Sequence, residues 1–198
     1  MVVQAGGESS RMGQDKALMP FLGRPLIERV VARVATLGEE VLITTNDSAA
    51  YRFLELPMYA DLRPGRGALG GLYTALRVAK HPDVAVVACD MPFVNAAILA
   101  EARRRLNVEA LDAVVPRTDR SFEPFHAVYR RETCLAAVER ALDADEWRLI
   151  SWFDDIRLGP MPVEDVQRYD PRMIAFWNVN TPEVFRQAEA LAREYPTI

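Results

Sequence analysis

The chain has little of what defines several large classes of protein. Its two cysteines, Cys89 and Cys134, lie far apart without CxxC spacing, which argues against a disulfide framework. No stretch approaches 18 consecutive apolar residues, which argues against a membrane span. Positive charge is not in excess, since 24 Lys and Arg stand against 28 Asp and Glu. The resulting net charge of -4 argues against a general nucleic-acid binder.

The remaining composition is typical of a soluble globular domain. The 198 residues are 50% hydrophobic and 26% charged, and this length predicts a single domain over 1–198. A core of that size needs neither a metal nor a disulfide to hold it together. The N-terminal segment lacks the charged region and the apolar stretch of a signal peptide, so we expect a cytoplasmic protein with no membrane or nucleic-acid partner.

Short apolar runs alternate with amphipathic stretches along the chain. This alternation predicts a three-layer α/β/α architecture, a Rossmann-like doubly wound and mostly parallel sheet with helices on both faces. Ligands of such sheets bind at the carboxyl ends of the strands. We expect strands at 2–3, 41–45, 84–89, 112–116, 125–129 and 175–180, a hairpin or edge strands at 156–163, and helices at 25–37, 48–54, 72–80, 95–106, 132–142, 145–153 and 182–193.

The segment Ala5–Lys16 (AGGESSRMGQDK) directly follows the first expected strand and has the composition of an anion-binding loop. Its glycines let successive backbone N–H groups converge on phosphate oxygens. Arg11 adds a planar fork of donors, and Lys16 adds a compact positive charge. The segment matches neither G-x-x-x-x-G-K-[ST] nor G-x-G-x-x-G, which disfavours a P-loop NTPase and a dinucleotide-binding Rossmann domain.

Five segments in order, AGGESSRMGQDKAL, GRPLIERV, DLRPGRGALGGLYTAL, VACDMPF and WNVNTPE, resemble the molybdenum cofactor guanylyltransferase family. The resemblance spans nearly the whole chain. It implies a fold of the nucleotide-diphospho-sugar transferase type, with a nucleotide-binding part at about 1–110 and an acceptor-binding part at about 111–198. The implied reaction joins GMP from GTP to molybdopterin carrying molybdenum and uses Mg²⁺. Implied partners are cofactor carrier or insertion proteins, and the implied state is a monomer or weak oligomer.

The same resemblance assigns roles to individual residues. Arg11 and Lys16 would hold the triphosphate, and Asp90 would contact both the nucleotide and Mg²⁺, so that these three form the catalytic set. Gln4 stands where the family has Leu, and Thr44 stands where some members have an Asn that reaches guanine, for which Asn46 is a substitute. The expected nucleotide-binding residues are Gln4, Ala5, Gly6, Gly7, Lys16, Thr44, Asn46, Asp61 and Asp90. The expected acceptor-binding residues are Gly67, Gly70, Gly71, His126, Asn178 and Asn180.

The chemistry of the reaction favours these residue types independently. An attacking phosphate and a triphosphate repel one another, so positioning and cations do most of the work. Asp90 follows a buried strand and can hold Mg²⁺ from a rigid support, although an aspartate before Met91-Pro92 also suits a turn. The glycine-rich segment 61–71 is interpreted as a basic flap over a substrate rather than a structural turn.

Several alternatives stay open at this point. A cytidylyl or sugar-phosphate nucleotidyltransferase would share the fold, and a non-catalytic nucleotide or cofactor carrier would share the loop. His126 is either a pterin contact or a hydrogen-bonded structural histidine. Cys89 and Cys134 are expected in the core. Trp147, Trp152 and Phe153 form either a pterin-side surface or part of the core, and the core is favoured.

Overall fold

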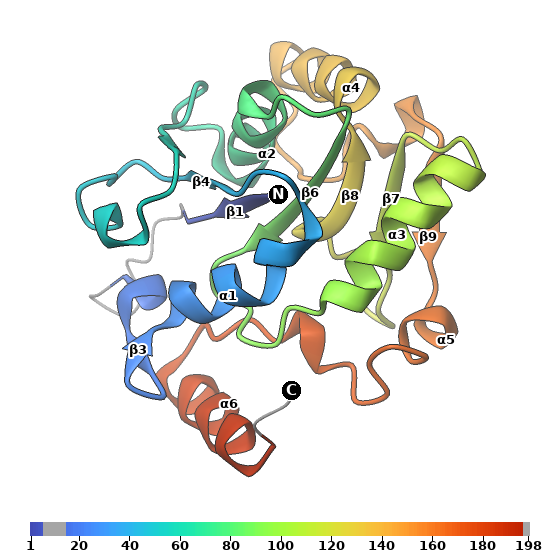
Figure 1. Cartoon of the computed structure of the whole chain (residues 1–198). Helices are drawn as coiled ribbons and strands as arrows, with labels where there is room; N and C mark the ends of the chain where they lie inside the picture. The colour runs from blue at the N-terminus through green and yellow to red at the C-terminus, as the bar shows by residue number, and fades with distance from the viewer. Residues whose placement is uncertain (6–14, 196–198) are drawn as a thin grey trace.

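A seven-stranded sheet forms the centre of the computed structural model, which describes residues 1–5 and 15–195 (Figure 1). Neighbouring strands run parallel except at β8, which is antiparallel to β6 and β7. In their order across the sheet the strands are β5 (Met58–Tyr59), β4 (Leu42–Thr44), β1 (Val2–Gln4), β6 (Asp83–Ala88), β8 (His126–Arg130), β7 (Ala113–Pro116) and β9 (Leu158–Met161).

Strand β1 lies inside the sheet, between β4 and β6. Val3 pairs with Ile43 on one side and with Val87 on the other, and all three side chains are buried. Branched apolar residues suit a strand that is covered on both faces, which explains the nearly continuous apolar runs at these positions. The parallel register brings the carboxyl ends of β1, β4, β5 and β6 to one edge of the sheet.

Helices cover both faces of the sheet. One face carries α2 (Gly67–Val78) and α4 (Arg131–Asp143), which lie next to each other at the top of Figure 1. The other face carries α1 (Leu26–Val34) and α3 (Ala96–Val108), whose apolar residues pack on Val3, Ile43 and Val87. No helix of these described ranges is both long enough and apolar enough to cross a membrane.

A third apolar cluster joins the C-terminal helix to an early part of the chain. Helix α6 (Pro182–Glu194) packs on the small hairpin of β2 (Pro20–Phe21) and β3 (Arg24–Pro25). The ring of Phe21 meets Phe185 edge-on at 5.5 Å and Phe93 at 6.5 Å between centroids. Such aromatic pairs add specific geometry to apolar burial. This packing brings the residues that precede α6 close to those that precede β2.

The predicted helix starts at Asn95 and Thr181 are confirmed. The Asn95 side chain accepts hydrogen bonds from Ala97 N and Ile98 N, and the Thr181 hydroxyl accepts one from Val184 N, with Pro182 at the first helical position. Both residues therefore satisfy N–H groups that a helix leaves without an internal partner. The strands expected at 41–45, 84–89, 112–116 and 125–129 are also present.

Three predicted elements are wrong, and each gives way to local hydrogen bonding. The helix expected at 48–54 is only a 3-10 turn at Arg52–Leu54. The aromatic helix expected at 145–153 does not form, since Asp145 takes a left-handed backbone (φ 60°) that ends α4; only Phe153–Asp155 form a 3-10 turn. The strand expected at 175–180 begins with the 3-10 turn Ile174–Phe176, where Asp170 accepts a hydrogen bond from Ala175 N.

The segment expected at 156–163 as a hairpin or edge strands forms the edge strand β9 and runs into the short helix α5 (Val163–Val166). Asp112, the residue before β7, binds Arg157, the residue before β9. Its buried carboxylate accepts hydrogen bonds from Arg157 N at 2.9 Å, Nε at 3.1 Å and Nη2 at 3.1 Å. These bonds lower the pKa of Asp112. The β7–β9 edge therefore depends on an ionised Asp112.

We predict that Asp112→Asn lowers the free energy of unfolding at pH 7 by about 1–3 kcal/mol, the range for hydrogen bonds to a charged group. Because the folded pKa is lowered, this stabilisation is complete above the unfolded value of about 4 and is lost as the pH falls through the folded value. Urea unfolding should therefore show a difference between wild type and variant that shrinks below pH 4. The exposed control Asp119→Asn should show no such difference, and a pH-independent gap for Asp112→Asn would contradict the assignment.

Candidate active site

Polar residues follow the strands at the edge of the sheet where β1, β4, β5 and β6 end. The backbone there continues the strand hydrogen bonds, with Ala5 N donating to Thr44 O at 2.8 Å and Cys89 N donating to Gln4 O at 3.0 Å. On the other side of β4, Thr45 N donates to Tyr59 O at 2.9 Å. These bonds hold the segments after the strands in fixed relative positions, which is what a rigid binding site requires.

A cleft of about 790 Å³ opens at this edge. Five of the residues predicted to bind substrate line it, namely Gln4, Ala5, Asn46, Asp61 and Gly67. The predicted residues Gly6, Gly7 and Arg11 lie outside the described part of the chain. The other described residues that line the cleft are Asp15, Thr45, Asp47, Gly65, Ala68, Phe125 and Trp147.

Asn46 and Asp61 hold each other at the rim of the cleft. Asn46 Nδ2 donates to Asp61 Oδ2 at 3.0 Å, and Asp61 N donates to Asn46 Oδ1 at 2.9 Å. The two residues follow β4 and β5, which are neighbouring parallel strands. This reciprocal pair orients the Asp61 carboxylate, which retains acceptor capacity for a ligand.

Lys16 and Asn180 meet although 164 residues separate them in the chain. Lys16 Nζ donates to Asn180 Oδ1 at 2.7 Å. Lys16 begins the 3-10 turn Lys16–Leu18, which Asp15 caps by accepting a hydrogen bond from Ala17 N at 3.0 Å. The other Asp15 oxygen accepts a hydrogen bond from the Tyr51 hydroxyl. The ammonium group of Lys16 is therefore carried by an anchored turn.

Asp90 lies beside this pair, directly after β6. Its backbone carbonyl accepts a hydrogen bond from Val179 N at 3.0 Å, which ties it to the segment that carries Asn178 and Asn180. Burial raises the pKa of the Asp90 carboxyl, and the positive charge of Lys16 acts in the opposite direction. Asn178 lies on the same segment and donates to Phe176 O at 3.1 Å. The fold thus unites three residues that the sequence predicted for the site: Lys16, Asp90 and Asn180.

The Asp90 carboxylate suits a Mg²⁺ ion that is held jointly by the protein and by substrate phosphates. No group of three or more His, Cys, Asp or Glu suited to a metal occurs within residues 1–5 and 15–195, so these residues provide no all-protein cage. Mg²⁺ is commonly held by one or two carboxylates together with substrate phosphates and water. A half-buried carboxylate beside a lysine, which can take phosphate oxygens together with the ion, suits such an arrangement.

Gln4 and Thr44 present buried oxygen atoms that lack partners. Gln4 is only 7% exposed, and neither its Oε1 nor Thr44 Oγ1 has a hydrogen-bond partner among the residues that the structure describes. The two residues are register partners on neighbouring strands, so their side chains point to the same face of the sheet. Orphaned buried polar atoms are costly and rare, which makes this pair a strong indication of a ligand.

The predicted flap at 61–71 is corrected by the structure. Helix α2 already begins at Gly67, so Gly70 and Gly71 are buried helical residues and cannot belong to a mobile loop. A Cβ on Gly71 would lie 1.8 Å from Gln4 Nε2, which shows that this glycine makes room for the Gln4 side chain. Gly67 is exposed, lines the cleft and has a left-handed φ of 54°.

His126 is buried on the opposite face of the sheet from Gln4 and is not among the residues that line the cleft. Its ring meets Phe176 edge-on at 5.1 Å, and neither ring nitrogen has a hydrogen-bond partner in the described part of the chain. Burial lowers its pKa to about 3, which keeps it neutral at pH 7. His126, predicted as a pterin contact, therefore does not lie in the cleft. The alternative prediction of a hydrogen-bonded structural histidine is also wrong, because the described residues offer its ring no hydrogen bond.

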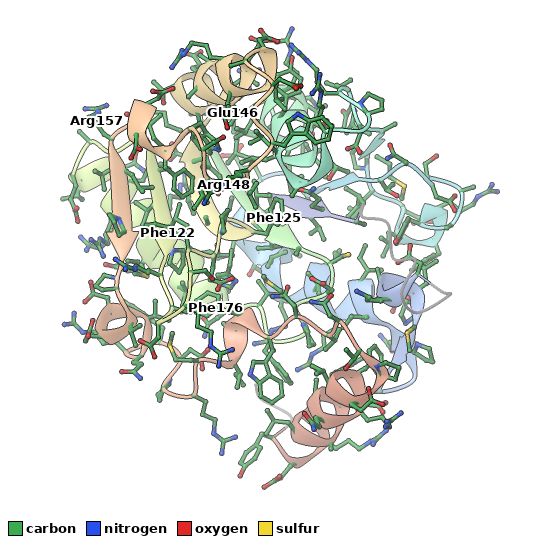
Figure 2. All side chains as sticks on the ribbon, turned by 180° about the vertical axis from the view of Figure 1, so that it is seen from behind. Phe122, Phe125, Glu146, Arg148, Arg157 and Phe176 are labelled. Carbon is green, nitrogen blue, oxygen red and sulfur yellow. The ribbon has the colours of Figure 1, made fainter. Side chains whose placement is uncertain are left out.

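Sequence reasoning missed two aromatic residues of the cleft. Trp147 was expected in the core but is 55% exposed, whereas Trp152 and Phe153 are buried as predicted. Phe125 lines the same cleft as Trp147. Figure 2, which views the molecule from the side opposite to Figure 1, labels Phe125 and the two chain neighbours of Trp147, Glu146 and Arg148. The pattern of the segment after α4 predicted a helix that does not form, and no signal in it distinguished a surface tryptophan from a core tryptophan.

Comparison with known proteins agrees with this geometry. The family model described as MobA-like NTP transferase domain matches residues 1–157. A molybdenum cofactor guanylyltransferase of Desulfosudis oleivorans is 32% identical over 190 residues, which cover 96% of this chain and 93% of the relative. A protein of Carboxydothermus hydrogenoformans, named "Probable molybdenum cofactor guanylyltransferase", is 36% identical over 92% of this chain and 90% of its own length.

Solved structures share the fold. Molybdopterin-guanine dinucleotide biosynthesis protein A from Archaeoglobus fulgidus superposes with a TM-score of 0.84 at 27% identity, covering 98% of both chains. The 2-C-methyl-D-erythritol 4-phosphate cytidylyltransferase of Thermus thermophilus superposes with a TM-score of 0.67 at 18% identity, again over 98% of both chains. The second likeness shows the fold alone.

The fold is that of solved nucleotidyltransferases, and the family model together with the curated relatives shows that the protein is of the nucleotidyltransferase class. The chain belongs to the MobA-like NTP transferase family and matches molybdenum cofactor guanylyltransferases over nearly its whole length. The fold and the family expected from the sequence are thereby confirmed.

The contact between Gly71 and Gln4 predicts that one substitution destabilises the wild type but stabilises a variant that lacks the Gln4 side chain. Gly71→Ala should lower the free energy of unfolding by about 1–3 kcal/mol, because the new methyl group overlaps the buried Gln4 carboxamide. In a Gln4→Ala background the overlap is gone, and the better helix propensity of alanine should make the same change stabilising by up to about 1 kcal/mol. A double-mutant cycle by urea unfolding measures this, and equal effects in both backgrounds would contradict the contact.

Proposed function

We propose that the protein transfers GMP from GTP to molybdopterin carrying molybdenum, with release of diphosphate and formation of the guanine dinucleotide form of the cofactor. The observation that carries this proposal is the meeting of Lys16, Asp90 and Asn180 at the end of β6. Relatives named molybdenum cofactor guanylyltransferase support both substrates. Molybdenum is here a part of the acceptor and not a resident metal.

The chemistry of guanine matches the orphaned oxygens of Gln4 and Thr44. The Watson–Crick edge of guanine carries two adjacent donors, N1–H and the 2-amino group, whereas that of cytosine carries one donor beside acceptors. Gln4 Oε1 and Thr44 Oγ1 can both accept hydrogen bonds. In this proposal the Gln4 amide, accommodated by Gly71, takes over selection of guanine, and the backbone of Ala5 and the Asn46–Asp61 pair contact the rest of the nucleoside.

The triphosphate lies toward Lys16 and Arg11 in the proposed complex. Lys16 supplies positive charge for the phosphate oxygens, and its anchored turn keeps the ammonium group in place without reorganisation. Asp90 is the residue that would hold Mg²⁺, and the ion would neutralise charge on the phosphates and on the departing diphosphate. No covalent protein nucleophile is required, since the terminal phosphate of the acceptor attacks the α-phosphorus of GTP.

The acceptor is assigned to the side of Asn178 and Asn180, whereas Gly67 lines the cleft together with Gln4 and Asp61 and is assigned to the nucleotide. Asn180 is bonded to Lys16, so an acceptor phosphate at Asn180 would stand next to the group that holds the triphosphate. Holding two reactants in this way removes much of the entropic cost of their meeting. Gly70 and Gly71 are not retained as acceptor contacts because they lie inside helix α2, and His126 is not retained because it lies on the other face of the sheet from Gln4 and does not line the cleft.

The single-domain organisation, with a nucleotide part at about 1–110 and an acceptor part at about 111–198, is part of this proposal. So are a monomeric or weakly oligomeric state and contacts with cofactor carrier or insertion proteins.

Incubation of the purified protein with Mg²⁺, molybdopterin carrying molybdenum, and either GTP or CTP tests the function. We expect diphosphate release and a guanine dinucleotide product with GTP, and at least tenfold less product with CTP, since each mispaired donor or acceptor left buried costs about 1–3 kcal/mol. A preference for CTP would replace the assignment by a cytidylyltransferase. Binding of GTP without any diphosphate release would favour the non-catalytic carrier.

We predict that Asp90→Asn abolishes transfer while the protein stays folded. The amide keeps the size of the carboxyl but loses the charge needed for Mg²⁺, and neutral Asn suits the buried position, where burial already raises the pKa of Asp90. The loss should be about 100-fold or more in kcat, as for other preorganised electrostatic contacts. Thermal unfolding serves as the check on the fold, and the exposed Asp154→Asn is the control. Wild-type turnover by Asp90→Asn would exclude Asp90 as the metal ligand.

A further inference from the structure

Trp147 is an exposed tryptophan in a cleft lined otherwise mainly by polar and small residues. Its side chain is 55% exposed, whereas Trp152, five residues later, is buried in the core. Large apolar side chains that stay exposed in a recess commonly mark a binding surface. The protein gains no core packing from this ring, so its place in the cleft needs another explanation.

The indole ring is held in position by its neighbours. Indole Nε1 donates to Asp145 Oδ1 at 2.9 Å, and Arg66 Nη1 binds the same oxygen. The Arg66 guanidinium lies 5.0 Å from the centroid of the indole ring. Asp145 itself adopts a left-handed backbone with φ 60°, which is uncommon for a residue other than glycine. The orientation of Trp147 is thus set by three local features.

A second ion pair fixes the segment that carries Arg66. Arg63 Nη1 binds Asp143 Oδ1 at 2.6 Å and so joins the segment before α2 to the end of α4. Together the pairs made by Arg63 and Arg66 connect the nucleotide part of the chain to the segment that carries Trp147. The indole is therefore a preorganised surface and does not need to be ordered by the ligand.

The surroundings of the indole leave space for a flat ring. Gly65 and Gly67, on either side of Arg66 in the chain, line the cleft together with Ala68 and Trp147. Arg66 touches the indole but is not among the described residues that line the cleft. The cleft therefore presents an aromatic ring, supported by a guanidinium, next to backbone that carries almost no side-chain bulk.

We propose that Trp147, supported by Arg66, is the stacking surface for the guanine base of GTP. The base is favoured over the pterin because the same cleft contains the ends of β1, β4 and β5, where the orphaned Gln4 oxygen lies. Aromatic side chains stack on nucleobases irrespective of their identity, so Trp147 supplies affinity whereas Gln4 and Thr44 supply selectivity. This inference rests on the proposed function, because it concerns the same nucleotide site.

The test measures nucleotide binding without any acceptor, by titration calorimetry in the presence of Mg²⁺. Trp147→Ala should weaken GTP binding by about tenfold or more, as stacking losses do elsewhere. Trp147→Phe, which keeps an aromatic face, should stay within about threefold of wild type on the same grounds. Inorganic triphosphate, which has no base, should bind wild type and Trp147→Ala equally. Phe53→Ala, which removes another exposed aromatic ring outside the cleft, is the matched control.

Fluorescence supplies a readout that a merely structural role would not change. GTP should quench wild-type tryptophan emission, and the quench should be absent in Trp147→Phe although that variant still binds GTP. Unchanged GTP affinity in Trp147→Ala would overturn the inference. An equal loss for inorganic triphosphate would overturn it too, and so would a change limited to the KM of the acceptor.

The two proposals fail separately. If wild type transfers GMP normally and Trp147→Ala binds GTP normally, the stacking role alone is wrong. If Trp147→Ala loses GTP affinity but the wild type forms no dinucleotide product with GTP or CTP, the base-stacking surface stands and the proposed transfer reaction is wrong.

Discussion

The position of β1 between β4 and β6 is the constraint on which the site depends. This strand has only three residues, yet its backbone is hydrogen-bonded on both sides, and its side chains are buried on both faces. Its register places Gln4 opposite Thr44 of β4 and opposite Ala88 of β6, two residues before Asp90. A slip of one residue would turn every side chain of β1 to the other face and would remove the Gln4–Thr44 pair.

Two sets of long-range contacts bring residues of the second half of the chain to the site at the edge of the sheet. The aromatic cluster around Phe21 holds α6 against the early hairpin, and Lys16 reaches Asn180 next to that cluster. On the other side of the cleft, the ion pairs of Arg63 and Arg66 bring the end of α4 and Trp147 to the segment before α2. The second half of the chain therefore supplies Phe125 and Trp147 to the cleft and Asn180 to the contact with Lys16.

Sequence periodicity was a good guide wherever an element is amphipathic or fully buried. The expected strands that became β4, β6, β7 and β8 exist, as do the helix starts at Asn95 and Thr181, because side-chain chemistry and local hydrogen bonds decide them. The predicted elements at 48–54, 145–153 and 175–180 do not form, although apolar residues of these irregular segments still pack into the core. In those segments local side-chain hydrogen bonds to the backbone, such as the bond from Ala175 N to Asp170, overrule the periodic pattern.

The amino-acid sequence by itself determined the layered fold and the family, and it predicted Lys16, Asp90 and Asn180 as site residues, since motifs and periodicity are local properties. Only the tertiary structure decided that Gly71 accommodates Gln4, that His126 is enclosed away from the cleft and that Trp147 faces into it. These outcomes depend on which surfaces of distant elements meet. Packing across the sheet decides these contacts, and the spacing of residues along the chain does not predict them.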